Sequence, residues 1–464
     1  MESEVPGAEI KQTTYIVISQ SSSKKTIQKI GGPIMKKYLS LLLAIMLLVL
    51  SACSNKSSDA GEKTGDAKNP AGTITVWGWD IAAATMKEAV EDFQKKYPDV
   101  KVQVEDFNSG DLYEKLTVGL AARGSGLPDV VLMEDERIPG YINQFPEGFL
   151  NLSKLGYDKH KDSFNPAKVA SVQDKDGNFI AAPWDIGPAG VFYRVDYFEK
   201  AGVDPESIKT WDDYIAAGKK IKEATGKKML PIDIPNYDGV FQMMMQQQGL
   251  SYFNEDEKIT LQSPEAVRAM KVIKQLHDED LILNNKGWDG IVTATVNGEV
   301  ATIPYGVWYT GTIMDQAPDL KGKWDVFFLP AFKEGGSRYA NVGGSSLLIP
   351  ASTKNESAAY AFLEYFTTNK EPQMIGFNNY GLFPSLKETY NEEQFTANNE
   401  YFNNGPIFKR FAEIVDEVPK IHLTKDYAKA SSLVSDSQAA ILLENKSVES
   451  ALKNAQKQLE NQMK

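Results

Sequence analysis

Short stretches in which hydrophobic and polar residues alternate are separated by segments with a helical spacing. "TITVWGWD" from Thr73 and "VKVQVEDF" from Val100 alternate as strands do. Between them, Met86, Val90 and Phe93 share one face of an expected helix. A second helix is predicted in "DLYEKLTVGLAARGSG" and a buried strand in "PDVVLMED". This order of strands and helices predicts a parallel sheet covered by helices, with ligand groups beyond the strand ends.

A second block of the same style begins near Asn178 with the alternating stretches "NFIAAPWD" and "GVFYRVDYF". A helix is expected after Thr210, because Asp213 three residues later completes a capping box, and another begins at Ser263 with a following proline. Further strands are predicted in "KMLPIDIP", "WDVFFLP" and "GGSSLLIP". The Gly-rich "AFKEGGSRYANVGG" suggests a return crossing between two lobes, and the chain from Lys387 onward is predicted to be mostly helical.

An uncharged apolar run from Tyr38 to Cys53 follows two lysines, which is the pattern of a secretory signal. The run is short for a membrane span, which needs about 20 apolar residues. Its end, Leu50-Ser51-Ala52-Cys53, resembles the lipobox of bacterial lipoproteins, in which the cysteine sulfur receives a diacylglycerol. We therefore expect Cys53, the chain's single cysteine, to be a lipid anchor and not a buried structural residue.

The segments around this signal are predicted to be non-structural. Residues 35–52 form the signal peptide and residues 53–72 a flexible tether, since the latter have almost no large apolar side chain. Residues 1–34 are expected to be an extension that is not part of the fold. Translation is expected to start at Met35, because Gly31-Gly32 can be encoded by a ribosome-binding sequence; a long signal n-region is the alternative.

Length and charge limit the possible functions. After Cys53 roughly 400 residues remain, which exceeds the size of a single core and favours two domains. The net charge of −12 disfavours nucleic acid and anionic ligands. The three histidines are far apart, and "QDKDGNF" has Pro183 where a calcium loop needs its glutamate, so no metal or cofactor is expected. A lipidated Cys53 leaves no thiol for catalysis.

At this point the segments have a recognisable order, which runs "ITVWGWD", "FQKKYPDVKV", "GLPDVVLMEDERIPGYI", "GNFIAAPWDIGPAGVFYR", "KTWDDY", "NGEVATIPYGVWYTG" and "GGSSLLIPASTKNESAAYAFLEYFTT". With the lipobox, this order resembles the extracellular solute-binding lipoproteins of ABC sugar importers, the group that includes maltodextrin-binding protein. The resemblance covers about Thr73 to Asn369. It implies an α/β fold of two lobes, periplasmic-binding-protein-like, with a multi-crossing hinge. It also implies a non-enzymatic monomer on the outer face of the cell membrane, with a carbohydrate ligand and an ABC permease as partners.

The resemblance divides the chain into lobes and supplies candidate sugar contacts. Lobe 1 is expected at 73–185 with a return at 337–386, and lobe 2 at 186–336 with C-terminal helices at 387–464. The candidate sugar-binding residues are Trp79, Asp80, Asp135, Glu136, Trp184, Asp185, Tyr237, Phe241 and Trp308. The choice among Glu134, Asp135 and Glu136 stays open. The other tryptophans, Trp77, Trp211, Trp288 and Trp324, are assigned mainly to structure.

The residue types themselves fit a sugar. An indole covers the apolar face of a pyranose, and a planar carboxylate accepts hydrogen bonds from two neighbouring hydroxyls. Tryptophans beside carboxylates also occur in glycoside hydrolases, so an exported glycosidase is an alternative. A binding protein for a non-sugar solute is the other alternative. The sequence favours a di- or oligosaccharide, because aromatic residues are spread over both predicted lobes.

Overall fold

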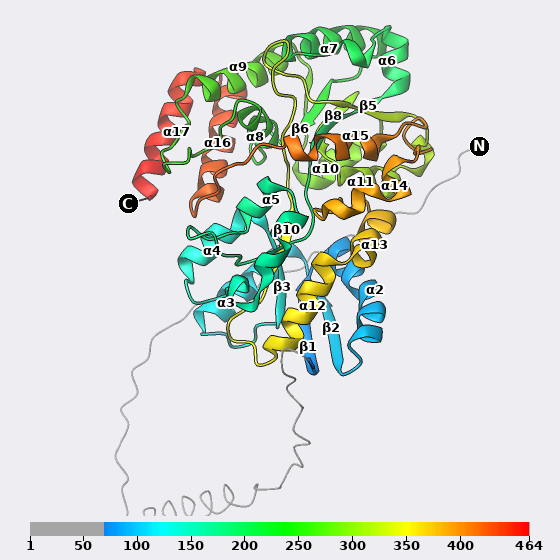
Figure 1. The fold of residues 1–464 in the computed structure, drawn as a ribbon. Coiled ribbons are helices and arrows are strands. Elements are labelled where there is room, and N and C mark those ends of the chain that lie inside the picture. The colour runs from blue at the N-terminus through cyan, green and yellow to red at the C-terminus, as the bar shows by residue number, and fades with distance from the viewer. Residues whose placement is uncertain (1–68, 464) are drawn as a thin grey trace, which may run out of the picture. The chain divides into compact units, whose positions relative to one another are not determined.

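The computed structural model describes residues 69–463. Cys53, the signal peptide, the extension at 1–34 and nearly all of the tether lie outside the described residues. Between residues 69 and 463, no helix combines the length and the apolar character that crossing a membrane requires. The described chain is α/β, with helices and strands interleaved along most of its length (Figure 1).

The first lobe is built on a five-stranded sheet in the order β2-β1-β3-β10-β4. Strand β1 is parallel to both β2 and β3, as the strand–helix order predicts. Strand β10 comes from much later in the chain and is antiparallel to β3 and β4. The strands are β1 (Gly72–Gly78), β2 (Val100–Asp106), β3 (Val130–Glu134), β4 (Ala182–Pro183) and β10 (Ser345–Leu348).

Helices from two parts of the chain cover this sheet. Early helices are α2 (Asp80–Lys96), α3 (Ser109–Ala121), α4 (Ile138–Gln144) and α5 (Pro166–Ser171), and later ones are α12 (Glu356–Thr368) and α13 (Lys370–Tyr380). Helix α2 contacts both α12 and α13, so the segment after β10 completes the first lobe (Figure 1). The predicted apolar faces are buried, since Met86, Phe93 and Leu116 are 0% exposed.

The second lobe contains a three-stranded antiparallel sheet, β8-β5-β9, and a parallel pair, β6-β7. These strands are β5 (Ala189–Arg194), β6 (Leu230–Ile232), β7 (Ile282–Asn284), β8 (Thr302–Gly306) and β9 (Trp324–Phe328). The stretch "GVFYRVDYF" is only half strand, because helix α6 begins at Val195. Alternation alone could not show this change, because it continues across the boundary, with Val195 and Tyr197 on either side of Asp196.

Two helices of the second lobe begin where the sequence predicts. Thr210 and Asp213 form the expected capping box of α7, and Ser263 caps α9 with Pro264 in its first turn. The chain after Lys387 is mainly helical, as predicted. The helices are α6 (Val195–Ala201), α7 (Trp211–Thr225), α8 (Gly239–Gln246), α9 (Pro264–Asp278), α10 (Gly287–Val296), α11 (Tyr309–Gln316), α14 (Glu393–Thr396), α15 (Ile407–Ile414), α16 (Tyr427–Leu442) and α17 (Val448–Gln462).

Short 3-10 helices connect many of these elements. They are η1 (Asp135–Arg137), η2 (Leu152–Leu155), η3 (Tyr157–Ser163), η4 (Pro205–Ser207), η5 (Pro318–Leu320), η6 (Lys387–Asn391) and η7 (Val415–Glu417). One of them, η1, directly follows β3 and carries two of the candidate carboxylates. The end of a strand in an open α/β sheet is where ligand groups are expected.

Three chain segments pass side by side between the lobes and are joined by backbone hydrogen bonds. Asp185 N donates to Ser345 O (3.3 Å) and Ile186 N donates to Phe383 O (2.9 Å). Val342 N, in the segment that leads to β10, donates to Gly187 O (2.8 Å) in the segment that leads to β5. Each lobe has its own hydrophobic core, and a third cluster includes Ile186 and Phe383 of the crossings. The exact lobe boundaries stay predictions.

Candidate functional site

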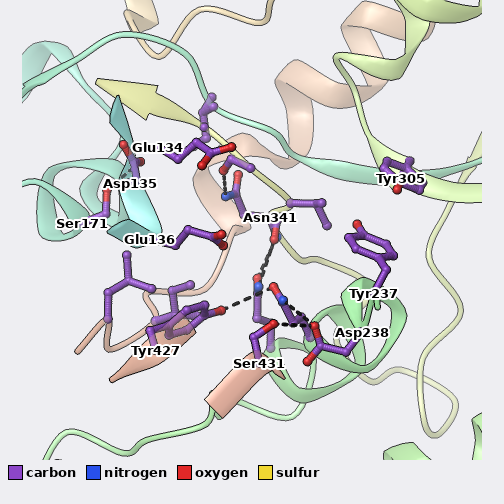
Figure 2. A pocket seen from close by; sticks show the side chains of 18 of the residues that line it. Glu134, Asp135, Glu136, Ser171, Tyr237, Asp238, Tyr305, Asn341, Tyr427 and Ser431 are labelled. Atoms are coloured by element: carbon purple, nitrogen blue, oxygen red, sulfur yellow. Dashed lines mark hydrogen bonds between the residues drawn. The ribbon is translucent and has the colours of Figure 1, made fainter. Parts of the chain in front are cut away.

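A cavity of about 560 Å³ is lined by residues from both lobes. The first lobe contributes Glu134, Asp135 and Glu136 from the end of β3 and from η1. The second lobe contributes aromatic side chains near β8 and polar ones near α8 and α16. Figure 2 shows carboxylates and aromatic rings from these elements around the same space. The volume lies within the range of about 300–1,000 Å³ that is usual for small-molecule sites.

The three consecutive acids of the first lobe have different environments. Glu134 accepts a hydrogen bond from Arg137 Nε (2.5 Å) and its carboxylate also contacts the Tyr113 hydroxyl (3.3 Å). In the described part of the chain, no hydrogen bond or ion pair engages the carboxylate of Glu136, and this exposed residue lines the cavity. Glu136 is therefore the acid of this trio whose carboxylate is not engaged by another described residue.

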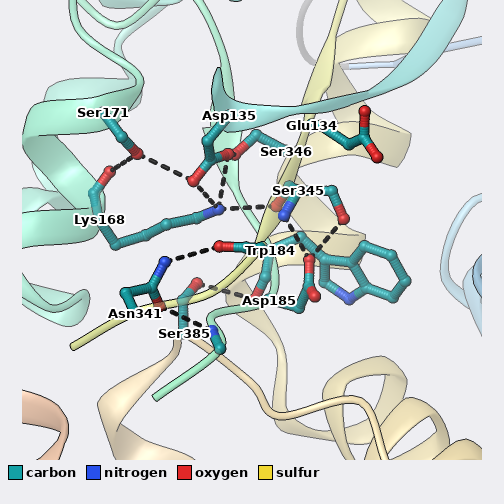
Figure 3. A network of polar contacts seen from close by, with 12 residues as sticks. Glu134, Asp135, Lys168, Ser171, Trp184, Asp185, Asn341, Ser345, Ser346 and Ser385 are labelled. Carbon is teal, nitrogen blue, oxygen red and sulfur yellow. Dashed lines mark hydrogen bonds and ion pairs between the residues drawn. The ribbon is translucent and has the colours of Figure 1, made fainter. Parts of the chain in front are cut away.

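Asp135 belongs instead to a buried network at the base of the cavity (Figure 3). Lys168 Nζ donates to both carboxylate oxygens of Asp135, at 2.8 and 2.6 Å, and to Ser345 O at 2.8 Å. The hydroxyls of Ser171 (2.9 Å) and Ser346 (2.7 Å) donate to the same carboxylate. A buried ion pair surrounded by hydrogen bonds in this way holds neighbouring segments in register.

Asp185 lies in the first crossing and binds to Ser345, whose carbonyl oxygen also accepts from Lys168. Its Oδ1 accepts from the backbone N (2.7 Å) and the hydroxyl (2.5 Å) of Ser345 in the return segment. Burial raises the pKa of Asp185, and the Lys168 charge together with the Ser345 donors opposes this shift. The side chain therefore ties two crossings together and does not line the cavity.

The pKa of Glu136 is raised from 4.5 to about 7. Withdrawal of the carboxyl from bulk water inside the cleft is the main cause, and the negative charge of Glu134 is the second. The Arg137 guanidinium lowers the pKa and only partly offsets these effects. Glu136 thus titrates near neutral pH.

The aromatic wall comes from the second lobe and consists of Tyr237, Trp288, Tyr305 and Trp308. Tyr237 and Tyr305 are stacked, with ring centroids 5.6 Å apart and planes at 11°. Trp308 lies edge-to-face with Tyr305 at 5.3 Å. The Trp308 Nε1–H donates to Val342 O (2.8 Å) in the return segment, which fixes the orientation of the half-buried indole.

A polar cluster on the second lobe completes the cavity. Asp238 accepts hydrogen bonds from Gln242 Nε2 (3.0 Å), from Ser431 Oγ (2.9 Å) and from the Tyr252 hydroxyl. Burial raises the pKa of Asp238, while these three donors lower it. Tyr427 at the start of α16 is buried beside this cluster and is one of the cavity residues (Figure 2).

The cavity contains four of the nine sugar contacts expected from sequence, namely Asp135, Glu136, Tyr237 and Trp308. The other five are not among its lining residues. Trp184 is 2% exposed and packs on Phe366, and Phe241 is 0% exposed and stacks on Tyr252. Asp185 serves the crossings, as described above. Trp79 packs near Tyr113, and Asp80 is exposed at the start of α2.

Among the cavity residues that were not predicted, four carry aromatic or acidic side chains suited to a ligand: Asp238, Trp288, Tyr305 and Tyr427. Trp288, which the sequence analysis assigned to structure, is 44% exposed. Tyr305 belongs to the quoted stretch "YGVWYTG", three residues before Trp308, and could have been inferred from its proximity. No local signal marks Tyr427, because it comes from a C-terminal helix far away in sequence. Within residues 69–463, no three His, Asp or Glu side chains are grouped as metal ligands would be.

Comparison with known proteins identifies the family. The model of a family described as bacterial extracellular solute-binding protein matches residues 78–371, more than half of the chain. The chain belongs to this family. An arabinooligosaccharide-binding protein from Bacillus subtilis (strain 168) is 30% identical to this solute-binding protein over 411 residues, which cover 86% of this chain and 92% of the relative.

Two further similarities extend this result. A lactose-binding protein from Rhizobium radiobacter is 32% identical over 364 residues, which cover 76% of this chain and 84% of the relative. A solved structure is that of the ABC transporter associated binding protein from B. animalis subsp. lactis Bl-04 in complex with beta-1,6-galactobiose. It has a TM-score of 0.69 and 28% identity, and the match covers 83% of this chain and 96% of that one. The resemblance and the two-lobe fold expected from sequence are thus confirmed.

Proposed function

We propose that this solute-binding protein captures a neutral di- or oligosaccharide outside the cytoplasm and delivers it, as a monomer, to the permease of an ABC importer. The observation that carries the proposal is the pairing of an aromatic wall with an unengaged carboxylate, Glu136, in one cavity. The relatives named above support it, since their names or bound ligands are arabinooligosaccharide, lactose and galactobiose.

The two walls suit the two kinds of surface on a sugar. An indole such as Trp308 covers the apolar C–H face of the ring. The carboxylate of Glu136 accepts hydrogen bonds from hydroxyls on the rim, and charge-assisted bonds of this kind are stronger than neutral ones. Because the walls belong to different lobes, a sugar that touches both favours closure of the lobes around it.

The charges of the cavity favour neutral ligands. Glu134, Asp135, Glu136, Asp233 and Asp238 are all acidic lining residues. The only lysine or arginine among the described lining residues is Lys168, which is buried and donates to Asp135 and Ser345. An anionic sugar would therefore meet negative potential without a free cation.

Most of the acidic side chains in the cavity already accept hydrogen bonds from other residues, which fits binding without catalysis. The raised pKa of Glu136 would suit a general acid, but a glycosidase also needs a second carboxylate that can act as base or nucleophile. Glu134, Asp135 and Asp238 each accept hydrogen bonds from other side chains. Asp233 accepts from Asn236 Nδ2 (2.9 Å) and from Gly287 N (2.7 Å).

A melting screen against neutral sugars tests the function. We expect at least one di- or oligosaccharide among arabinose-, galactose- and glucose-based series to raise the melting temperature. At about 100 times the dissociation constant, the stabilisation should be about 2.7 kcal/mol. The same incubations should release no new reducing ends. Absence of any shift would contradict sugar binding, and new reducing ends would indicate a hydrolase.

Scattering tests the expected closure. Small-angle scattering with and without the sugar found by the screen should show a smaller radius of gyration in the bound state. An unchanged radius at saturating sugar would contradict closure while leaving sugar binding intact.

The anchor at Cys53 is part of the proposal. We expect Cys53→Ala to move the protein from the membrane fraction to the soluble fraction without changing its melting temperature, because the tether has no core residues. Ser54→Ala, one residue further on, is the control and should stay membrane-bound. A Cys53→Ala protein that remains in the membrane fraction after a high-salt wash would contradict the anchor.

A further inference from the structure

We propose that Trp288 is a second sugar-stacking platform beside Trp308, and that it makes the protein prefer saccharides of two or more residues over single sugars. The inference rests on the proposed function and adds the residue that makes the site select a ligand of two or more sugar units. It is carried by the exposure of Trp288, by its contacts with other rings and by its separation from Trp308.

The exposure of Trp288 is unusual for its size. Among the large hydrophobic side chains of residues 69–463, five are substantially exposed, and Trp288 at 44% is the one aromatic ring in that group: Ile81, Val118, Trp288, Val296 and Leu443. Of these five, Trp288 is the one that lines the cavity. Exposed apolar surface at a cavity marks a place where a partner covers it.

Trp288 is supported by two neighbouring rings of the second lobe. Its ring centroid lies 5.6 Å from that of Tyr309, with planes at 88°, and 6.1 Å from that of Tyr305, with planes at 61°. Both contacts are edge-to-face, a favourable arrangement for aromatic pairs. The indole is therefore held in place while almost half of its surface stays open to water.

The backbone at this position is also fixed. Gly287, the first residue of α10, has a φ of +64°, and its N–H donates to Asp233 Oδ2 (2.7 Å) in the segment after β6. Asn285 Nδ2 donates to Gly290 O (3.1 Å), which ties the preceding loop to the helix. A platform held in this way loses little conformational entropy when a ligand stacks on it.

The distance between the two indoles determines how they can be used. Their centroids are 5.7 Å apart and their planes are inclined at 40°. A single sugar ring sandwiched between two indoles would need a separation of about 7–8 Å, twice the usual carbon–carbon contact distance. Trp288 and Trp308 therefore cannot sandwich one ring. They offer two adjacent, inclined surfaces, which suit consecutive residues of a saccharide chain.

A chain-length series tests the inference. The dissociation constants of galactose and β-1,6-galactobiose, arabinose and arabinobiose, and glucose, maltose and maltotriose are measured by calorimetry. The proteins are the parent, Trp288→Ala, Trp288→Phe and the control Val296→Ala. Val296 is an exposed apolar residue on the same helix and is not a cavity residue.

In the series that binds, we expect the parent to prefer the longer saccharide. Trp288→Ala should weaken binding of saccharides with two or more residues by about tenfold or more, a loss of about 1.4 kcal/mol, because each tenfold change in affinity has that value. Binding of the monosaccharide should change less than about twofold. Trp288→Phe should recover part of the loss, and Val296→Ala should resemble the parent. Melting curves without sugar identify any variant that is misfolded.

Other outcomes overturn the inference in distinguishable ways. Equal binding of monosaccharide and disaccharide by the parent, or an equal loss for both in Trp288→Ala, removes the chain-length role while the proposed function stands. An unchanged affinity in Trp288→Ala does the same. If no sugar in any series binds the parent, the proposed function fails and this inference fails with it.

Discussion

Two neighbouring carboxylates, Asp135 and Glu136, show how differently the protein uses the same chemistry. Asp135 is 8% exposed and accepts hydrogen bonds from Lys168, Ser171 and Ser346 in the network beneath the crossings. Glu136, one residue later, faces the cavity without a partner among the described residues. The crossings therefore contain polar groups that are satisfied internally, whereas the cavity keeps a polar group for a ligand to satisfy.

The tryptophans divide in the same way. Trp184 at the first crossing is 2% exposed and packs on Phe366, so its area already stabilises the fold. Trp288 and Trp308 keep exposed surface in the cavity, which a ligand can cover. Substitutions in the crossing region should therefore reduce stability, and substitutions in the cavity should reduce affinity.

The largest expected effect is that of Lys168→Met. Removing one partner of a buried ion pair leaves the Asp135 charge uncompensated and should lower the free energy of unfolding by about 3–5 kcal/mol in denaturant titrations. The exposed Lys161→Met is the matched control and should change it by less than about 0.5 kcal/mol. Adding Asp135→Asn to Lys168→Met should recover part of the loss. Equal stability of Lys168→Met and the parent would contradict the structural role of this pair.

Trp184→Ala should be comparably destabilising, by about 3–5 kcal/mol, because it opens a cavity in the first core. At temperatures where the variant is folded, its sugar affinity should remain close to that of the parent. Denaturant unfolding and calorimetry measure the two quantities separately. A loss of affinity with little loss of stability would instead place Trp184 among the ligand contacts, as the sequence analysis expected.

Trp308→Ala should show the opposite balance. Loss of a stacking surface should weaken sugar binding by about 1–3 kcal/mol, roughly tenfold or more in dissociation constant. Because the indole is half-buried, we expect an apo destabilisation smaller than that of Trp184→Ala. Trp308→Phe, which keeps a ring but removes the Nε1–H donor to Val342 O, should fall between. Unchanged affinity together with a large apo loss would assign Trp308 to the core.

The smallest effect is expected for Glu136→Gln and depends on pH. Since the folded-state pKa of about 7 lies above the ordinary 4.5, the folded protein binds this proton more tightly than the unfolded chain. The parent should therefore lose stability as pH rises from about 4.5 to about 7, and Glu136→Gln should not show this contribution. The effect on stability is modest because Glu136 is an exposed residue, and solvent screens its interactions with neighbouring charges.

Melting temperatures of the two proteins from pH 4.5 to pH 8 measure this difference. We expect the melting temperature of Glu136→Gln to rise relative to that of the parent as the pH increases through this window. The control Glu114→Gln removes an exposed acid on α3 outside the cavity and should follow the parent. Parallel curves for Glu136→Gln and the parent would contradict the raised pKa of Glu136.

The sequence by itself determined the local elements and the family. Period-two and period-3.6 spacing located β1 to β3 with α2 and α3, and the capping residues Thr210 and Ser263 located two helix starts, because these signals depend on neighbours within a few residues. The family resemblance added an indole at Trp308 and a carboxylate at Glu136 as candidate sugar contacts, and both line the cavity.

Only the tertiary structure decided which polar and aromatic residues are used internally. Whether Asp135, Asp185 or Trp184 is free depends on partners as distant in sequence as Ser345, Ser346 and Phe366. In the same way, Trp288 becomes a cavity residue through contacts that the folded second lobe creates. Residue type indicates what a side chain can bind. Long-range packing determines whether its partner is water, a ligand or another part of the protein.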